Sequence, residues 1–344
     1  MSTFRVALSG DFRKPDGSPA YPMFDLGPLE KDPRIELLYV DPVDGAIPAS
    51  ALEDVDALIL LVPRFSRGSV PKSGRLAIVA RFGVGFDSVD VDACSDNGIV
   101  LCTTPDGVRR PVAVAILTFI LALAGKLKTK DTLVRQGPKG WAKRSEHMGM
   151  GLVGRTLGQL GIGNIGAEVF RITAPLGMRF IAHDPYADEA MAKELGIELV
   201  DLETLFRESD FLSVSCPLND ETRGIVNAER LALMKPTAYV INTSRGPTVD
   251  QKALHDALKS GRIAGAGLDV FEVEPTADGE PITSLDNVLL APHALCWTDQ
   301  CFAGIGAADV EAVLAVSRGE IPRGIVNRDI VDNETFKAKL ARYR

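Results

Sequence analysis

Short apolar runs rich in β-branched residues alternate with stretches of helical periodicity along most of the chain, and Gly and Pro separate them. Strands are expected at 4–8, 36–40, 57–61, 77–80 and 99–101, and again at 156–160, 179–182, 211–215, 238–242, 265–268 and 288–290. Helices are expected at 112–123, 165–176, 191–195, 251–260 and 304–317. Because strands that alternate with helices build parallel sheets, the pattern predicts an α/β fold.

The pattern also predicts two domains. The long apolar segment 112–123 is expected to connect them, and a polar loop at 136–150 follows it. The second α/β series ends well before the C-terminus, so the last segment is expected to return to the first domain. We therefore predict one domain of residues 1–104 and 300–344 and another of residues 105–299.

Composition narrows the classes of function. The chain has 344 residues, 46% of them hydrophobic, with a net charge of −8, which argues against a nucleic-acid-binding surface or a basic membrane patch. The start shows no secretory signal, and the apolar run 112–125 is too short to span a bilayer. Five cysteines without a CxxC pair are typical of reduced thiols, so a cytoplasmic protein is expected.

A glycine-rich turn opens the second domain. Gly161, Gly163 and Gly166 follow a predicted strand and begin a predicted helix, the context of a dinucleotide-binding loop. Asp184 ends the next strand, where a carboxylate accepts hydrogen bonds from ribose hydroxyls and repels a 2′-phosphate. NAD is therefore favoured over NADP. The alternative is that Asp184 only caps the turn before Pro185.

Three charged or titratable residues follow later strands. Arg245 comes after the apolar run 239–242 and His293 after Pro292, so both are expected at the carboxyl edge of the sheet, where such folds bind ligands. An arginine grips a carboxylate in two hydrogen bonds, and a histidine exchanges a proton with a carbonyl oxygen. Glu274 could hold the imidazole and favour its protonated form. The alternatives are a surface arginine and a structural His–Glu pair.

These motifs identify a resemblance. Ile-Asn-Thr-Ser-Arg-Gly, Gly-Leu-Asp-Val-Phe-Glu and Ala-Pro-His, in this order, resemble the NAD-dependent D-isomer-specific 2-hydroxyacid dehydrogenases, including phosphoglycerate dehydrogenases and glyoxylate/hydroxypyruvate reductases. The resemblance spans about residues 78–327. It implies two Rossmann-like, doubly wound domains: a flavodoxin-like substrate domain (1–104 and 300–344) and an NAD-binding domain (105–299). It also implies hydride transfer between a D-2-hydroxy acid and its 2-keto acid.

The resemblance assigns roles to individual residues. Arg245 would bind the substrate, His293 would be the acid/base and Glu274 its partner. The backbone amides of Gly83 and Val84 would hold the substrate carboxylate. The remaining residues that the resemblance places against NAD are Asn164, Ile165, Pro217, Thr222, Thr243 and Asp269. It implies a homodimer, with Trp141 in the polar loop as a subunit contact, and no metal.

Departures from the family pattern concern the substrate. Arg109 and Arg110 oppose the dipole at the start of the apolar helix, so either one reaches an extra anionic group or both are a solvated pair. Trp297 follows His293 where small residues are usual, and would line the pocket or pack under the last helix. Arg64, at the end of an early strand, is a further substrate candidate.

Two other functions stay open. One is a dehydrogenase of another small anion, such as phosphite or formate, although the formate type would be expected to lack Glu274. The other is a catalytically weak, NAD-sensing protein like the corepressors that share this fold.

Overall fold

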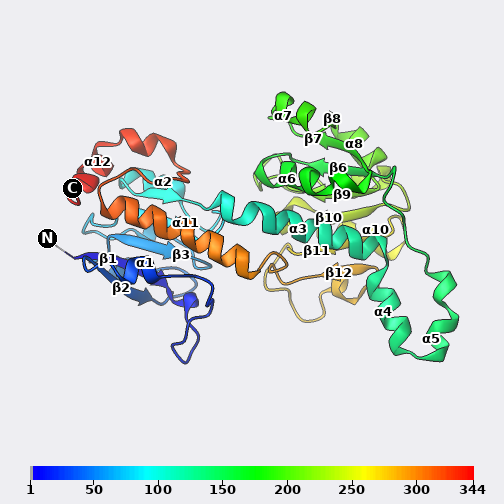
Figure 1. The fold of residues 1–344 in the computed structure, drawn as a ribbon, viewed down its shortest axis with the longest axis horizontal. Coiled ribbons are helices and arrows are strands. Elements are labelled where there is room, and N and C mark those ends of the chain that lie inside the picture. The colour runs from blue at the N-terminus through cyan, green and yellow to red at the C-terminus, as the bar shows by residue number, and fades with distance from the viewer. Residues whose placement is uncertain (1–2) are drawn as a thin grey trace. The chain divides into compact units, whose positions relative to one another are not determined.

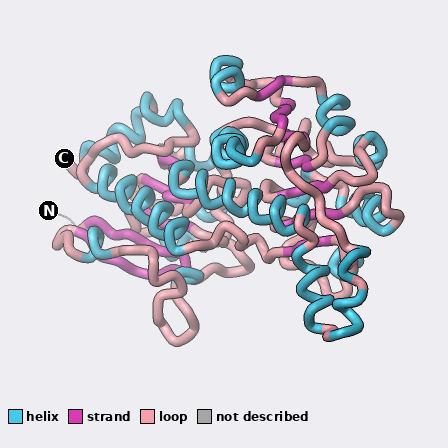
Figure 2. The backbone as a smooth tube through the Cα atoms, turned by 45° about the vertical axis from the view of Figure 1, so that its right-hand side comes forward, coloured by secondary structure: helices cyan, strands magenta, loops and turns pink. Residues whose placement is uncertain are grey.

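The computed structural model describes residues 3–344, which form two compact units (Figure 1). Unit 1 combines residues 3–108 with Trp297–Arg344, and unit 2 is Arg109–Cys296. In each unit helices flank strands, as the cyan and magenta segments of Figure 2 show.

Unit 1 is built on a parallel sheet of five strands in the order β2-β1-β3-β4-β5. This is the flavodoxin-like order, in which the chain changes direction between β1 and β3. The strands are β1 (Phe4–Ser9), β2 (Ile35–Val40), β3 (Ala57–Leu60), β4 (Ile78–Arg81) and β5 (Val100–Cys102). The helices are α1 (Gly27–Glu30), α2 (Val91–Asp96), α11 (Asp299–Ser317) and α12 (Glu334–Ala341).

Unit 2 is built on a parallel sheet of seven strands in the order β12-β11-β10-β9-β6-β7-β8. The strands are β6 (Thr156–Leu160), β7 (Arg179–His183), β8 (Ile197–Leu199), β9 (Phe211–Val214), β10 (Tyr239–Asn242), β11 (Gly265–Leu268) and β12 (Val288–Leu290). The helices are α4 (Leu127–Arg135), α5 (Pro138–Ala142), α6 (Asn164–Thr173), α7 (Glu189–Glu194), α8 (Leu202–Glu208), α9 (Ala228–Leu233) and α10 (Gln251–Lys259). The direction changes between β6 and β9, so ligands are expected beyond the carboxyl ends of these strands.

The predicted fold class is confirmed, and the differences are local. Helix α3 (Pro105–Ala124) begins seven residues before the predicted start at 112. Pro111 lies inside α3, although proline in a helix interior removes a hydrogen bond. The expected polar loop 136–150 contains α5, and α4 precedes it; their polar faces hid both from the apolar pattern.

Helices α3 and α11 are each long and apolar enough to span a membrane by length and composition. The apolar run in α3 was predicted to be too short, because its first residues were not counted. Half of the α3 window and 61% of the α11 window are buried inside the structure. Phe119 of α3 packs on Gly267 of β11, and α11 contacts β4, so both helices have the apolar surface that a sheet-covering helix needs.

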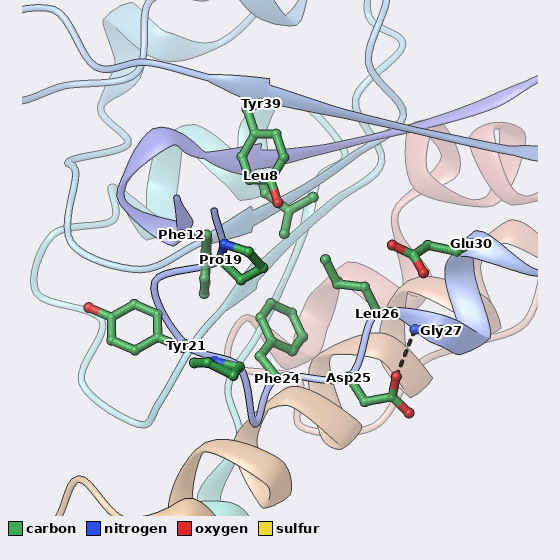
Figure 3. Close-up of a pocket in the computed structure, with 11 residues that line it drawn as sticks. Leu8, Phe12, Pro19, Tyr21, Phe24, Asp25, Leu26, Gly27, Glu30 and Tyr39 are labelled. Carbon is green, nitrogen blue, oxygen red and sulfur yellow. Dashed lines mark hydrogen bonds between the residues drawn. The ribbon is translucent and has the colours of Figure 1, made fainter. Parts of the chain in front are cut away.

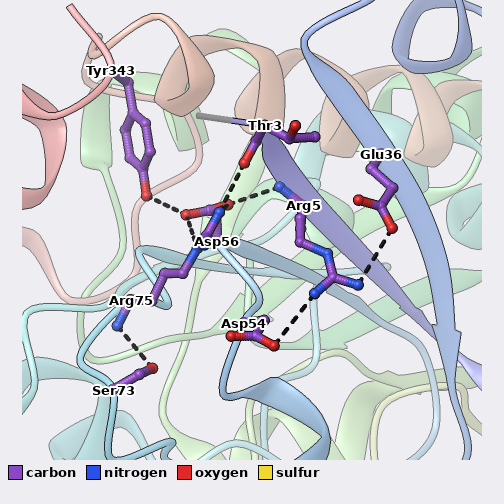
Figure 4. Close-up of polar contacts among 8 residues, drawn as sticks. All are labelled: Thr3, Arg5, Glu36, Asp54, Asp56, Ser73, Arg75 and Tyr343. Atoms are coloured by element: carbon purple, nitrogen blue, oxygen red, sulfur yellow. Dashed lines mark hydrogen bonds and ion pairs between the residues drawn. The ribbon is translucent and has the colours of Figure 1, made fainter. Parts of the chain in front are cut away.

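The last segment of the chain is fastened to unit 1 by polar contacts. The buried Lys339 of α12 donates through Nζ to the carbonyl oxygens of Leu76 and Asn97 at 2.6 and 2.7 Å. Tyr343 donates its hydroxyl to Asp56 at 2.7 Å, and Arg75 contacts the same carboxylate (Figure 4). These bonds fix the C-terminal helix against the edge of the unit 1 sheet.

Candidate active site

Glycines in the turn after β6 let neighbouring backbone segments approach closely. Gly161 has φ of +91°, and a Cβ there would lie 2.9 Å from the Cys216 nitrogen. A Cβ on Gly166 would lie within 2.3 Å of the Gly161 carbonyl oxygen, so helix α6 can pack this close only with glycine. Gly163 is the N-cap residue of α6, and it has no side chain that could bond to the first N–H groups of the helix. A Cβ on Gly163 would meet no atom within 4 Å, so the backbone is open at the N-terminal end of α6.

Asp184 stands beside this turn. Its Oδ2 accepts from the Ile162 N–H at 2.9 Å, and its Oδ1 accepts from the Tyr186 N–H at 2.9 Å. The carboxylate thus caps its own turn, as the alternative interpretation expected, and is held next to the dinucleotide loop. Each oxygen retains lone pairs for a ribose hydroxyl.

The two arginines of α3 differ in their contacts. Arg110 pairs through Nε with Oε1 of Glu168 at 2.7 Å, and Glu168 is a buried residue of α6. This ion pair connects α3 to α6. The sequence did not indicate Glu168 as a partner of Arg110. Arg109 lies beside the cofactor loop, with Nη1 3.5 Å from Oδ1 of Asn164.

Four other predicted cofactor residues lie on nearby turns. Thr222 donates through Oγ1 to the Pro217 carbonyl at 2.6 Å, which closes the loop after β9. Thr243 is half-buried directly after β10, and Ile165 is half-buried in the first turn of α6. These positions follow the carboxyl ends of strands on both sides of the change in direction.

The predicted trio follows three neighbouring strands. Arg245 comes after β10, Glu274 after β11 and His293 after β12, and these strands lie side by side in the sheet. His293 Nδ1 is 2.7 Å from Glu274 Oε2, and the Phe271 N–H donates to Glu274 Oε1 at 2.9 Å. Burial opposes ionisation of Glu274, but the bonds from His293 and Phe271 outweigh it and lower the pKa of the carboxyl. The predicted His–Glu pair is therefore present.

The turn of Arg245 is held against the turn of Glu274. Asn242 accepts from the Ser244 N–H at 3.0 Å and donates to the Arg245 carbonyl at 3.0 Å, which fixes the turn. A Cβ on Gly246 would lie 1.7 Å from the Phe271 carbonyl oxygen. The two backbones therefore touch because residue 246 is glycine. The charge of Arg245 also contributes to the lowered pKa of Glu274, after burial and the hydrogen bonds.

Asp269 shapes the turn that carries His293. Its buried carboxylate accepts from the N–H groups of Ala294 and Leu295 at 2.9 and 3.1 Å. His293 itself has φ of +54°, a left-handed backbone that non-glycine residues adopt at a cost. Burial raises the pKa of Asp269, and the two N–H groups oppose this rise. In this structure Asp269 organises the His293 turn, a role that the sequence did not indicate.

A cavity of about 450 Å³ opens beside the pair. Its lining is mostly apolar and includes Glu274 and His293; the other residues are Phe271, Pro275, Thr276, Thr283, Leu290, Ala291 and Pro292. Within residues 3–344, no group of three or more His, Cys, Asp or Glu is arranged to hold a metal ion.

Unit 1 carries the predicted carboxylate loop. The Gly83 N–H donates to Oγ1 of the buried Thr104 at 3.0 Å, and the Thr104 N–H donates to the Gly83 carbonyl at 2.9 Å. In this structure the Gly83 N–H is engaged by Thr104. In the described part of the chain, the N–H groups of Val84 and Gly85 donate to no protein acceptor. Both N–H groups can therefore donate to solvent or to a ligand.

The last two substrate candidates also lie in unit 1. Arg64 is exposed and donates through Nη2 to the Asp44 carbonyl at 3.0 Å. Trp297 packs edge-on against Tyr21 and Phe302, at ring-centroid distances of 5.6 and 5.2 Å. It thus packs against α11, the helix that the sequence predicted to be the last one, and keeps 45% of its surface exposed.

Comparison with known proteins decides the family. Residues 117–294, just over half of the chain, match the model of the D-isomer specific 2-hydroxyacid dehydrogenase, NAD binding domain. The chain belongs to this dehydrogenase family. It is therefore an oxidoreductase with a nicotinamide-cofactor domain, and the family predicted from its motifs is confirmed.

Similar proteins with assigned activities agree with the family. The chain is 41% identical over 282 residues to a glyoxylate reductase of Korarchaeum cryptofilum, covering 81% of this chain and 85% of the relative. It is 35% identical over 285 residues to a D-3-phosphoglycerate dehydrogenase of Methanocaldococcus jannaschii, covering 82% of this chain and 54% of the relative.

Solved structures give the same result. D-lactate dehydrogenase of Aquifex aeolicus, complexed with NAD and lactic acid, has a TM-score of 0.80 at 29% identity, covering 94% of this chain and 99% of that one. An NADPH-dependent glyoxylate/hydroxypyruvate reductase of Sinorhizobium meliloti, in complex with NADP and malonate, has a TM-score of 0.80 at 30% identity, covering 94% and 97%.

Proposed function

We propose that this dehydrogenase interconverts a D-2-hydroxy acid and its 2-keto acid, with His293 as acid/base, Glu274 as its partner and Arg245 as substrate ligand. The observation that carries the proposal is the 2.7 Å contact between His293 Nδ1 and Glu274 Oε2, beside the turn of Arg245. A half-exposed imidazole with one nitrogen fixed by a carboxylate presents its other nitrogen to a ligand.

Substrate binding would use charge and open N–H groups. Arg245 would grip the substrate carboxylate and polarise the adjacent carbonyl, as a guanidinium does through two parallel hydrogen bonds. Val84, the second predicted amide, would donate to the same carboxylate, and the open Gly85 N–H supports this loop as the anion site. Gly83 would serve by holding the loop on Thr104.

Proton transfer would take place at His293 Nε2. In the direction of reduction, Nε2 donates its proton to the carbonyl oxygen as the keto carbon gains a hydride, and in oxidation it accepts the hydroxyl proton. The nicotinamide, when bound, supplies or accepts that hydride. Glu274 holds Nδ1 and stabilises the imidazolium, and its lowered pKa keeps it ionised for this purpose.

The cofactor would lie on the α6 N-terminus, with Asn164 and Ile165 at the pyrophosphate, Pro217 and Thr222 at the adenosine, and Thr243 and Asp269 toward the nicotinamide. We propose NAD in preference to NADP, because Asp184 places a carboxylate at the end of β7, where it would repel a 2′-phosphate. Arg109, beside Asn164, is then better placed for a cofactor phosphate than for the substrate.

The substrate that the comparisons favour is a small 2-keto acid. Several relatives at 37–41% identity are glyoxylate reductases, which supports glyoxylate as the first substrate to test. Trp297 and Arg64 stay as proposed determinants of the accepted side chain.

We further propose a cytoplasmic homodimer. Exposed apolar side chains gather on α4, α5 and the segment after them: Leu127, Val134, Trp141, Met148 and Val153. Such a surface is typical of a subunit contact. A solution mass equal to one chain would contradict the dimer.

The test is His293→Ala with His147→Ala as the matched control. Loss of a positioned general acid lowers turnover by roughly 10²–10⁴-fold. NADH binding should stay intact in both variants, and the control should turn over glyoxylate like the wild type. Near-normal turnover in His293→Ala would refute the assignment. A panel of glyoxylate, hydroxypyruvate, phosphohydroxypyruvate and bulkier keto acids then defines the substrate, and no turnover with any of them would favour a sensor.

A further inference from the structure

A second cavity, of about 380 Å³, lies in unit 1 away from the His293 turn in sequence (Figure 3). It is formed by the ends of β1 and β2 and by the segment that leads into α1. Its lining consists of aromatic and aliphatic side chains and two acids: Leu8, Phe12, Pro19, Tyr21, Pro22, Phe24, Asp25, Leu26, Gly27, Glu30 and Tyr39. This size is within the range of small-molecule sites.

The charges of the lining have one sign. Asp25 and Glu30 are the two ionisable acids, and the lining contains no Lys, Arg or His. Figure 3 shows both acids on one side of the cavity, with Phe12 and Tyr21 on the other. Asp25 uses Oδ1 to accept from the Gly27 N–H at 2.9 Å, and Glu30 forms no ion pair within residues 3–344. The Glu30 charge is therefore available to a ligand.

The aromatic rings supply the complementary surface. The faces of tyrosine and phenylalanine rings carry negative potential and attract cations. The Tyr39 ring already forms a cation–π contact within the protein, because the guanidinium carbon of Arg13 lies 5.1 Å from its ring centroid. Rings on one side and carboxylates on the other favour a cation that carries an apolar body.

We propose that this cavity binds an organic ammonium ion that carries an aromatic or aliphatic body. The ammonium group lies against Glu30 and Asp25, and the body packs on Phe12, Phe24 and Tyr21. None of these residues has a role in the reaction proposed above, and Tyr21 packs on Trp297, the proposed determinant of the substrate side chain.

The cavity has a built-in reporter. Tyr21 lines it and packs edge-on against Trp297 at 5.6 Å. The chain has two tryptophans, so Trp141→Phe leaves Trp297 as the single source of tryptophan fluorescence. A ligand that displaces the Tyr21 ring changes the surroundings of the Trp297 indole.

The experiment titrates Trp141→Phe protein, without substrate, with phenethylammonium, with phenylacetate and with 2-phenylethanol. We expect saturable quenching or enhancement with phenethylammonium and at least about fivefold weaker binding of the anion and the alcohol, consistent with the loss of a partly exposed charge pair. Equal binding of all three, or no saturable change confirmed by calorimetry, overturns the proposal.

Glu30→Gln in the same background should weaken phenethylammonium binding by about fivefold. Glu229→Gln is the matched control, because each residue is an exposed acid in the first turn of a short helix. Equal weakening in both variants, or in neither, overturns the assignment to this cavity. Circular dichroism establishes that both variants are folded before the titrations are compared.

Discussion

Gly246→Ala should disable the enzyme without removing any charged group. The contact that matters joins a Cβ at position 246 to the carbonyl oxygen of Phe271, which would be 1.7 Å apart. Real Cβ atoms essentially never approach another heavy atom closer than 3.0 Å, so the two backbones must separate by about 1.3 Å, the difference of these distances. Neither atom belongs to a flexible side chain that could rotate away.

That separation moves Arg245 relative to Glu274 and His293. Displacement of about 1 Å in a catalytic group can cost on the order of 10²-fold in rate, so we expect kcat/KM to fall by about this factor. Extra volume in a tight contact also costs about 1–3 kcal/mol of stability, which a folded domain can absorb.

The assay is steady-state NADH oxidation with the best keto acid, next to NADH binding measured by fluorescence. Gly151→Ala is the control, because a Cβ there meets no atom within 4 Å and should leave both values unchanged. A folded Gly246→Ala enzyme with kcat/KM within about threefold of the wild type would refute the argument that this contact positions the trio.

Three further predictions follow from polar contacts described above. Asp184→Asn should lower the ratio of kcat/KM for NADH to that for NADPH by about tenfold or more, since it removes the charge that opposes a 2′-phosphate; an unchanged ratio would show that another residue sets the preference. Tyr343→Phe should lower the free energy of urea unfolding by about 1–2 kcal/mol through loss of the bond to Asp56 (Figure 4), and an unaltered midpoint would contradict this. Burial lowers the pKa of Lys339 from 10.5 to about 8, so the unfolded chain binds more protons above pH 8. The stability of the wild type relative to Lys339→Met should therefore rise between pH 8 and 10, and a flat difference would exclude the shift.

Much of the site could be predicted because parallel strands end at a common edge. Arg245 and His293 each follow an apolar run, and in a doubly wound sheet such positions converge whatever the distance along the chain. The same argument succeeds for Asp184 beside Gly161. Strand patterns and strand ends are thus sufficient to locate charged residues that share one sheet edge.

What the sequence did not indicate depends on individual contacts. Asp269 could be read as a ligand-facing acid, but its bonds to Ala294 and Leu295 depend on how the next loop turns. The Thr104 bond to Gly83 joins residues 21 positions apart, and no local signal marks it. A buried hydroxyl that satisfies one N–H is recognisable only after the backbone positions are known.

The sequence did not predict the short helices α4, α8 and α9 or the short strand β8, for a different reason. Each is short and has only one or two buried residues, so the apolar periodicity is weak. In α8 and α9 the capping residues Asp201 and Asn227 were the available signal.

The left-handed backbone at His293 also limits which residues can replace the proposed acid/base. Glycine and asparagine occupy φ near +54° at the least cost, whereas β-branched residues strain it. Among descendants that keep the fold but abandon catalysis, we therefore expect Asn or Gly at this position more often than Val, Ile or Thr. The residue found at position 293 in such proteins would then reflect the backbone conformation of the turn and not a role in proton transfer.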